Sequence, residues 1–298
     1  MNKRYYKYLT TSQEDIKWGI YLTGVGHIKV DKGTNYPLTD DPSHHYFHWS
    51  TGRRLCEYQI LYITKGQGVF ESEATGQKKV KAGDIIILFP NIWHRFKPDK
   101  KTGWDEYWVE FKGILIEHFR LRDFLRPEQA IISIGIHDDL ANNYINIINL
   151  VKNETPGFQY VISGILIQIL GQIIAIKKYH PFEGREIEIK IKQAKLIILE
   201  NIETPVQQEE ISRRIGMGYS LYRKRFKEYT GISPAQYQIQ LRIKKAMALL
   251  ITSKLSLKEI AYRLSFDSLD YFCRVFKQKT GITPSTYREI NQKQKRCS

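Results

Sequence analysis

Few residues in this chain have the types and spacing that catalysis requires. The acidic pair Asp105-Glu106 follows Trp104 and has the composition of a general acid and a general base. Because consecutive residues of a strand point to opposite faces of the sheet, the two carboxyl groups cannot enter one pocket. The chain also has no Ser-His-Asp or Cys-His order, no glycine-rich phosphate loop and no His-Glu-X-X-His pattern. We therefore expect a protein that is not an enzyme and that uses no cofactor.

A different chemistry is offered by cations that recur in the last third of the chain. Phe226–Tyr237 returns fifty positions later as Phe276–Tyr287, with seven of twelve residues identical. In each copy a short amphipathic segment (208–215 and 257–264) precedes a polar turn and a second segment that ends at Thr-Gly-Ile. This order is typical of a helix-turn-helix, whose second helix can enter the DNA major groove. The second segments carry Arg223, Lys224, Arg225, Lys227, Arg274, Lys277 and Lys279.

A solvated charged face on an ordinary helical bundle is the alternative interpretation of one such helix. The duplication favours DNA binding, because a spacer helix over 234–251 can hold two recognition helices about 34 Å apart, one turn of DNA. The period of that spacer predicts Tyr237, Leu241, Met247 and Leu250 on the inward face, and Arg242, Lys244 and Lys245 on the outward face.

The distribution of charge agrees with a polyanion partner. The whole chain has 46 Lys and Arg against 31 Asp and Glu, a net charge of +15. Residues 187–298 hold 22 of these cations against 10 acids, so this segment alone carries +12, and residues 1–186 carry only +3. We therefore expect the DNA-binding part at the C-terminal end.

The three cysteines, Cys56, Cys273 and Cys297, are too scattered for a disulfide framework, which favours a reducing compartment. The N-terminus has no apolar signal-peptide core, and the longest apolar stretch, Ile162–Ile176, falls short of the roughly 20 residues of a membrane span. These features predict a cytoplasmic protein with no membrane partner.

Residues 57–111 show short apolar or alternating runs that are separated by turn residues. The predicted breaks lie at Lys65–Gly68, Thr75–Gln77 and Lys81–Asp84, and such regular spacing favours an all-β sandwich or barrel. Between Asp138 and Tyr179 the period becomes helical and predicts two adjacent amphipathic helices. These helices either cover the barrel or form a dimer interface.

The second repeat contains enough further motif residues to indicate a family. They are Ile260-Ala261, Phe266, Tyr271-Phe272, Arg274-Val275-Phe276-Lys277, Gly281-Ile282-Thr283-Pro284 and Tyr287-Arg288. On these residues, region 190–290 resembles the DNA-binding domain of the AraC/XylS family of bacterial transcription regulators. The resemblance implies an all-α domain with two helix-turn-helix motifs joined by a long helix, and double-stranded DNA and RNA polymerase as partners.

The resemblance also implies which side chains contact bases. Arginine is the usual reader of guanine O6 and N7, serine serves several bases, and aspartate accepts from cytosine N4. For Cys273 a core-packing role is as good an interpretation as a groove contact. Ser265 departs from the family's usual glycine, and a side chain in a positive-φ turn adds strain. Carried over by position, the base contacts are Ser220, Arg223, Lys224, Leu269, Asp270, Cys273 and Arg274.

The N-terminal part is similar to the cupin-like effector domain of sugar-responsive members of the same family. The residues that carry this similarity are Tyr58–Gly68, Ala82-Gly83-Asp84, Leu88-Phe89-Pro90, His94, Trp104, Tyr107-Trp108-Val109 and Phe111. A cupin can hold a metal, and His44, His45 and His48 are clustered, but the next glutamate, Glu57, is too far along the chain for the cupin metal motif. We therefore expect no metal.

The resemblance places a set of sugar-contacting residues in this barrel. An indole face stacks on the C–H face of a sugar, while Arg, His and Glu bond its hydroxyl groups. Ordinary barrel core is the alternative role of Phe96 and Trp108, and Arg53 matches the family position better than Arg54. The candidate ligand-binding residues are Arg53, Arg54, His94, Phe96, Glu106 and Trp108.

Together these features predict a multi-domain α+β chain. Its parts are a cupin-like effector-binding domain (1–135), a helical dimerisation segment (136–180), a linker (181–189), the tandem helix-turn-helix domain (190–290) and a basic tail (291–298). We expect a homodimeric transcription regulator, by family default an activator, that responds to a monosaccharide or short oligosaccharide. The alternatives are a regulator whose barrel binds a non-sugar effector or a protein partner and, more remotely, a DNA-tethered cupin enzyme.

Overall fold

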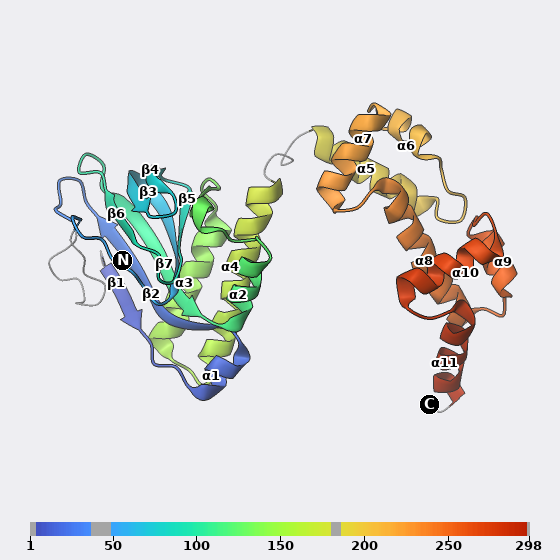
Figure 1. Cartoon of the computed structure of the whole chain (residues 1–298), viewed down its shortest axis with the longest axis horizontal. Coiled ribbons are helices and arrows are strands. Elements are labelled where there is room, and N and C mark those ends of the chain that lie inside the picture. The colour runs from blue at the N-terminus through green and yellow to red at the C-terminus, as the bar shows by residue number, and fades with distance from the viewer. Residues whose placement is uncertain (1–3, 37–48, 180–185, 297–298) are drawn as a thin grey trace. The chain divides into compact units, whose positions relative to one another are not determined.

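The computed structural model describes residues 4–36, 49–179 and 186–296. The chain divides into two compact units, residues 1–180 and 181–298. The first is an antiparallel sheet with helices and the second is entirely helical, so the fold is a cupin-like α+β domain followed by an all-α domain (Figure 1).

All paired strands of the first unit are antiparallel, and they form one curved sheet in the order β1-β2-β7-β3-β5-β8, with β4 and β6 also paired to β3. Isoleucine, valine and aromatic residues dominate their buried positions, which is the composition expected of strands that pack on both faces. The strands are β1 (Arg4–Tyr8), β2 (Tyr21–Val30), β3 (Tyr58–Ser72), β4 (Gly76–Lys81), β5 (Asp84–Leu88), β6 (His94–Pro98), β7 (Trp104–Lys112) and β8 (Ile131–Ser133).

Strand β3 corrects the expected break at Lys65–Gly68, because it runs without interruption for 15 residues. Its first part pairs with β5 and β7, and its last part pairs with β4 and β6. The change of partner coincides with a register shift between Ile63 and Lys65 and with Gly66, whose φ is 80°. A Cβ at Gly66 would lie 2.1 Å from Gly103 O, so glycine here permits a bend rather than a turn.

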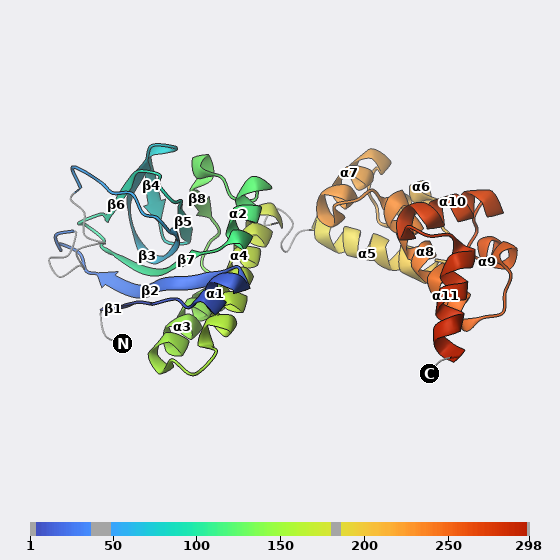
Figure 2. The ribbon, with the colours of Figure 1, turned by 60° about the horizontal axis from the view of Figure 1, so that its bottom comes forward.

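Helices α3 (Asp138–Asn153) and α4 (Phe158–Tyr179) lie side by side and pack on β2 and β7 (Figure 2). Leu140 and Tyr144 of α3 and Leu166 and Ile169 of α4 belong to the same hydrophobic core as the sheet. The two predicted helices therefore cover the barrel, and residues 1–135 and 136–180 form one unit rather than two. The remaining helical elements of this unit are α1 (Gln13–Trp18), α2 (Ile114–Leu121) and the short 3₁₀ turn η1 (Pro127–Gln129).

Helix α4 is longer than the apolar stretch that the sequence indicated. In the part of the chain that the structure describes, Phe158–Lys178 is the one helical segment with the length and composition of a membrane span, and 39% of its most apolar window is buried. Packing on the sheet accounts for that buried share, since Ile162 and Ile173 are fully enclosed.

The second unit contains two helix-turn-helix modules with separate cores. Its helices are α5 (Glu186–Glu200), α6 (Gln208–Arg214), α7 (Tyr219–Thr230), α8 (Pro234–Thr252), α9 (Leu257–Arg263), α10 (Leu269–Thr280) and α11 (Pro284–Arg296). Helix α5 begins at Glu186, so residues 186–189 are helical rather than linker, and α11 includes residues 291–296 of the expected tail. Residues 180–185 and 297–298 lie outside the described residues.

The repeated Thr-Gly-Ile sequence ends the second helix of each module in the same way. Gly231 and Gly281 have φ of 82° and 83°, the left-handed conformation that glycine adopts without a Cβ penalty. The hydroxyl groups of Thr230 and Thr280 bond the carbonyls four residues earlier at 2.7 and 2.9 Å. In the first module, Ser233 then caps α8 through a reciprocal contact with Gln236.

Candidate DNA interface and effector pocket

The two modules close their turns with equivalent hydrogen bonds. Met217 N–H donates to Ser212 O at 2.9 Å, and Phe266 N–H donates to Ala261 O at 3.0 Å. The residue before each donor is left-handed: Gly216 has φ 61° and Ser265 has φ 51°. The expected positive φ at Ser265 is therefore confirmed, and the second turn carries the strain of a non-glycine residue.

Helices α7 and α10 present most of the predicted base-contacting residues to solvent. Cys273 is the exception, because it is half-buried and packs against the core of the second module. Arg223 lies over the Tyr219 ring at 5.6 Å, and Arg274 lies over the Tyr271 ring at 5.5 Å, so both guanidinium groups are supported by an aromatic face. The exposed members are Ser220, Arg223, Lys224, Leu269, Asp270 and Arg274.

Arg242 does not point outward, as the period of α8 predicted. One terminal nitrogen of its guanidinium donates to Leu264 O at 3.1 Å and to Ser265 O at 2.7 Å, and the group stacks 4.4 Å from the Phe266 ring. Burial lowers the pKa of Arg242 from its usual value. Its long side chain reaches the carbonyls left free at the end of α9, and in this way it supports the second turn.

Within the barrel, four of the predicted ligand-binding residues line one pocket. Arg53, Phe96, Glu106 and Trp108 are brought together there from the segment before β3, from β6 and from β7. Further lining comes from Arg4, Tyr6, Tyr8, Ile28, Tyr36, Gln59 and Leu61.

Arg53 is the cation of this pocket and is held by several contacts. Its backbone exchanges two hydrogen bonds with His94, its Nε donates to His94 Nε2 at 3.3 Å, and its guanidinium lies 5.5 Å from the Phe96 ring. Burial lowers the pKa of Arg53, while the nearby tyrosines and the carboxyl groups of Glu110 and Glu106 act in the opposite direction. The pocket thus combines a desolvated cation with acidic groups.

The acidic pair separates as strand alternation requires. Glu106 is 2% exposed and lines the pocket. Asp105 instead bonds His27 Nε2 at 2.6 Å, and His27 stacks on Tyr107 at 4.3 Å. Two carboxylates that face away from each other cannot act on one substrate atom.

The pocket is small in this conformation, about 40 Å³, which is room for water rather than for a sugar. A larger open groove of about 940 Å³ lies elsewhere on the same unit. None of the six predicted residues lines that groove, and its lining includes four lysines: Lys79, Lys81, Lys97 and Lys100.

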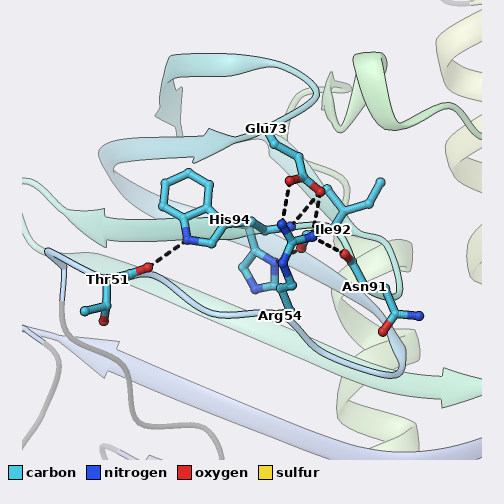
Figure 3. A network of polar contacts seen from close by, with 7 residues as sticks. Thr51, Arg54, Glu73, Asn91, Ile92 and His94 are labelled. Carbon is cyan, nitrogen blue, oxygen red and sulfur yellow. Dashed lines mark hydrogen bonds and ion pairs between the residues drawn. The ribbon is translucent and has the colours of Figure 1, made fainter.

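Arg54 does not line the pocket and instead fastens the chain beside it. Its guanidinium makes two parallel bonds to the Glu73 carboxylate, at 2.8 and 2.7 Å, and also bonds Asn91 O (Figure 3). The same carboxylate accepts from Trp93 N–H at 3.1 Å, and the Trp93 indole N–H donates to Thr51 O at 2.7 Å. These contacts hold the pKa of Glu73 below its usual value, chiefly through the Arg54 bond.

His94 also differs from its expected place. Its ring is 1% exposed and borders a separate small hollow lined by Phe70, Ser72 and Phe89. Nδ1 lies 3.0 Å from Ile92 O (Figure 3), so with the proton on Nδ1 the Nε2 atom accepts from Arg53. The geometry makes His94 a support for Arg53 rather than part of the pocket lining.

A metal site is not evident where the structure describes the chain, since no three His, Cys, Asp or Glu side chains there are grouped to hold an ion. The histidines His44, His45 and His48 lie outside the described residues.

Two family models match the two units that the geometry separates. The AraC-like ligand binding domain matches residues 36–170, and the helix-turn-helix domain matches residues 211–290. The chain belongs to the AraC family of transcriptional regulators. It is accordingly a DNA-binding regulator with a ligand-binding domain and not an enzyme.

Full-length relatives of this AraC-family chain are regulators as well. The MmsAB operon regulatory protein of Pseudomonas aeruginosa is 23% identical over 81% of this chain and 78% of that protein. The raffinose operon transcriptional regulatory protein RafR of Pediococcus pentosaceus is 26% identical, covering 78% and 84% of the two chains. The lactose operon transcription activator of Staphylococcus xylosus is 26% identical, covering 79% and 86%.

Several residues that line the pocket of this AraC-family protein were not predicted from the sequence. Tyr6 and Tyr8 alternate along β1, a period of two that would have placed them on one face had this strand been recognised. Gln59, 2% exposed, is the polar residue within an apolar run of β3, and a polar residue enclosed in this way is a signal of a binding site. Arg4 and Tyr36 carried no comparable signal.

Proposed function

We propose that this AraC-family regulator is an activator whose barrel binds a monosaccharide or short oligosaccharide in the Arg53 pocket. The observation that carries the proposal is the convergence of Arg53, Gln59 and Glu106 with the aromatic residues Phe96 and Trp108. A neutral polyhydroxylated ligand needs acceptors, donors and an aromatic face together, and this pocket supplies all three.

The buried polar atoms support a ligand that donates hydrogen bonds. Gln59 Oε1 is enclosed and has no hydrogen-bond partner among the described residues. A buried acceptor without a hydrogen bond costs free energy. A sugar hydroxyl that donates to it therefore contributes more to the free energy of binding than the same bond to an exposed group. Glu106 offers a second acceptor and Arg53 offers donors, which gives the ligand a defined orientation.

Room for the ligand comes from side-chain movement at the edge of the sheet. The pocket wall includes Tyr6 and Tyr8 on β1, which pairs through its backbone with β2 alone in the described sheet. An edge strand held on one side moves at lower cost than a central one. Ligand binding then favours one conformation of the regulator over another, and this population shift changes the affinity of the protein for DNA.

Names of relatives agree with this proposal, since two of them are described as regulators of raffinose and lactose operons.

We further propose that the protein acts in the cytoplasm, contacts RNA polymerase and binds double-stranded DNA through α7 and α10. In this proposal Arg223, Lys224 and Arg274 are the principal readers. Ser220, Leu269 and Asp270 flank them, and half-buried Cys273 contributes least.

A homodimer is part of the proposal, and the outward face of α4 is its interface. Tyr160, Val161 and Ile167 are large apolar side chains exposed there. A Cβ added at Gly164 or Gly171 would meet nothing within 4 Å, so a second helix can approach closely. Sedimentation of the full chain should show a dimer that Val161→Glu converts to a monomer, and a wild-type monomer would contradict this part.

Tryptophan fluorescence tests the proposed effector class. All five tryptophans lie in the ligand-binding unit, including Trp104 and Trp108 of β7. Titration of the full chain with pentoses, hexoses and short oligosaccharides should give a saturable change with one sugar, and Trp108→Phe should reduce it. If no sugar of the panel changes the fluorescence and none raises the Tm, the carbohydrate proposal is rejected.

The lysine-lined groove favours one alternative, an anionic non-sugar effector. Its lining holds four lysines, Lys79, Lys81, Lys97 and Lys100, against two acidic residues, Asp84 and Asp99. Inorganic phosphate and small dicarboxylates belong in the same titration, together with a Lys79→Ala/Lys81→Ala variant. A response to these anions that the double variant removes, without any response to neutral sugars, would favour this alternative.

A further inference from the structure

The DNA reader consists of two modules that share one helix. The first core contains Ile211, Tyr222 and Phe226, and the second contains Ile260, Phe272 and Phe276. Helix α8 contributes to both, with Tyr237 and Leu241 in the first and Ile243, Ala246 and Leu250 in the second. A single shared helix fixes the distance between two modules more firmly than their relative rotation, because a small twist or bend of α8 rotates one module against the other while each core stays packed.

A second connection runs through the loop between α5 and α6, residues 201–207. Its neighbours in sequence belong to the first module, yet Ile202 packs against the core of the second. The Glu203 carboxylate bonds Arg263 Nε at 3.1 Å and lies 3.8 Å from Lys245 Nζ. The loop therefore ties the first module to α8 and α9.

Ser265 completes this connection from the other side. Its hydroxyl donates to Glu203 O at 2.7 Å, while its own carbonyl accepts from Arg242. At the equivalent turn of the first module the residue is Gly216, which has no side chain to make such a bond. A serine at φ 51° is strained relative to glycine, and the hydrogen bond to the loop offsets that strain.

We infer that Glu203 and Ser265 are positioning residues for DNA recognition, forming a clasp between the modules that fixes how α7 and α10 are spaced and rotated. Recognition helices on one face of DNA must match its helical repeat, and one added base pair displaces a half-site by about 3.4 Å and rotates it by about 35°. A clasped reader rejects a displaced half-site, whereas an unclasped reader accepts it through a twist or bend of α8.

Stability is not the role of this clasp. The side chains of Glu203, Arg263 and Lys245 are 39%, 50% and 45% exposed, and exposed ion pairs contribute little to folding. Both modules keep their own cores when the contacts are removed. The clasp variants should therefore fold normally and show their effect in the choice of DNA.

In the experiment, the full-length wild type first selects a duplex from a random pool. One base pair is then inserted between the two half-sites that the selected duplexes share. The quantity measured is the ratio of Kd for the inserted duplex to Kd for the parent. The test variant is Glu203→Gln/Ser265→Gly. The matched control is Glu210→Gln, which also removes a carboxylate with two cationic partners, Arg213 and Arg214, but within one module.

We expect the insertion to weaken wild-type binding about tenfold or more, and the double variant to lower that ratio at least about threefold. The control should keep the wild-type ratio, and Arg263→Gln alone should give an intermediate value. An unchanged ratio in a double variant whose circular dichroism matches wild type would overturn the inference. So would a wild type that is indifferent to the insertion, whereas failure to enrich any duplex would contradict DNA binding itself.

Discussion

Arg53 and Arg54 are consecutive in the chain, yet Arg53 lines the pocket and donates to His94 Nε2 behind it, while Arg54 binds the Glu73 carboxylate at 2.7 Å outside the pocket. Their roles in ligand binding should differ accordingly. Arg53→Ala removes charge-assisted hydrogen bonds and should weaken sugar binding about 10- to 100-fold in a fluorescence titration. Arg54→Ala is the matched control and should cost less than about threefold. Equal losses in the two variants would contradict this assignment.

The Arg54 and Glu73 contact should also make stability depend on pH. The pKa of Glu73 is lower in the folded chain, chiefly because of the Arg54 bond, so the unfolded chain binds more protons in acid. The contact stabilises the fold above the usual glutamate pKa of 4.5 and is lost as the pH falls through the lower folded value. The difference in thermal unfolding between wild type and Glu73→Gln should therefore be largest near pH 7 and shrink below pH 4.5. A difference that stays constant into acid would contradict the ionic contact.

Arg242 should be the cationic residue of α8 whose loss most weakens the second module. Arg242→Ala removes two bonds to the carbonyls of Leu264 and Ser265 and should cost about 2 kcal/mol of local stability. Hydrogen exchange measured over 257–280 should then accelerate about 30-fold. Exposed Lys244→Ala provides the control, with no change expected beyond about 0.5 kcal/mol. Equal exchange in both variants would show that Arg242 is dispensable.

Arg274 and Lys279 should differ in what they contribute to DNA binding. Arg274→Ala should cost about 1–3 kcal/mol on a selected duplex and relax discrimination at one base position. Lys279→Ala, near the end of α10, should weaken specific and random duplexes alike and reduce the salt dependence by about one phosphate. Kd values on both duplexes at several salt concentrations measure this. Uniform weakening by Arg274→Ala would show that it contacts only the backbone.

The tandem reader was predictable from the sequence because its signals are local. Helix ends at Gly231 and Gly281 and the strained turn at Ser265 depend on residues within one turn. The predicted outward position of Arg242 was wrong. The helical period gives the direction in which a side chain leaves the helix, whereas the long Arg242 side chain extends back to the end of α9. Its position depends on tertiary packing, which no local pattern carries.

The barrel was predicted less completely for the same physical reason. Gly66 indicated a turn, but its environment is set by Gly103, a residue that approaches it from a distant part of the chain. The sequence favoured Arg53 over Arg54 as the ligand-binding residue, and Arg53 is the one that lines the pocket. His94 was expected to line the pocket, but it supports Arg53 instead, because the direction of its ring depends on the Ile92 carbonyl and could not be read from spacing.

The most direct test of the central claim is to measure DNA and sugar affinity on the same full-length protein. We predict that the sugar found in the fluorescence panel changes Kd for the selected duplex, and that the duplex changes Kd for the sugar by the same factor. Arg53→Ala should abolish this coupling while leaving binding of the sugar-free protein to DNA intact. A sugar that saturates the pocket without altering DNA affinity would contradict a sugar-responsive regulator.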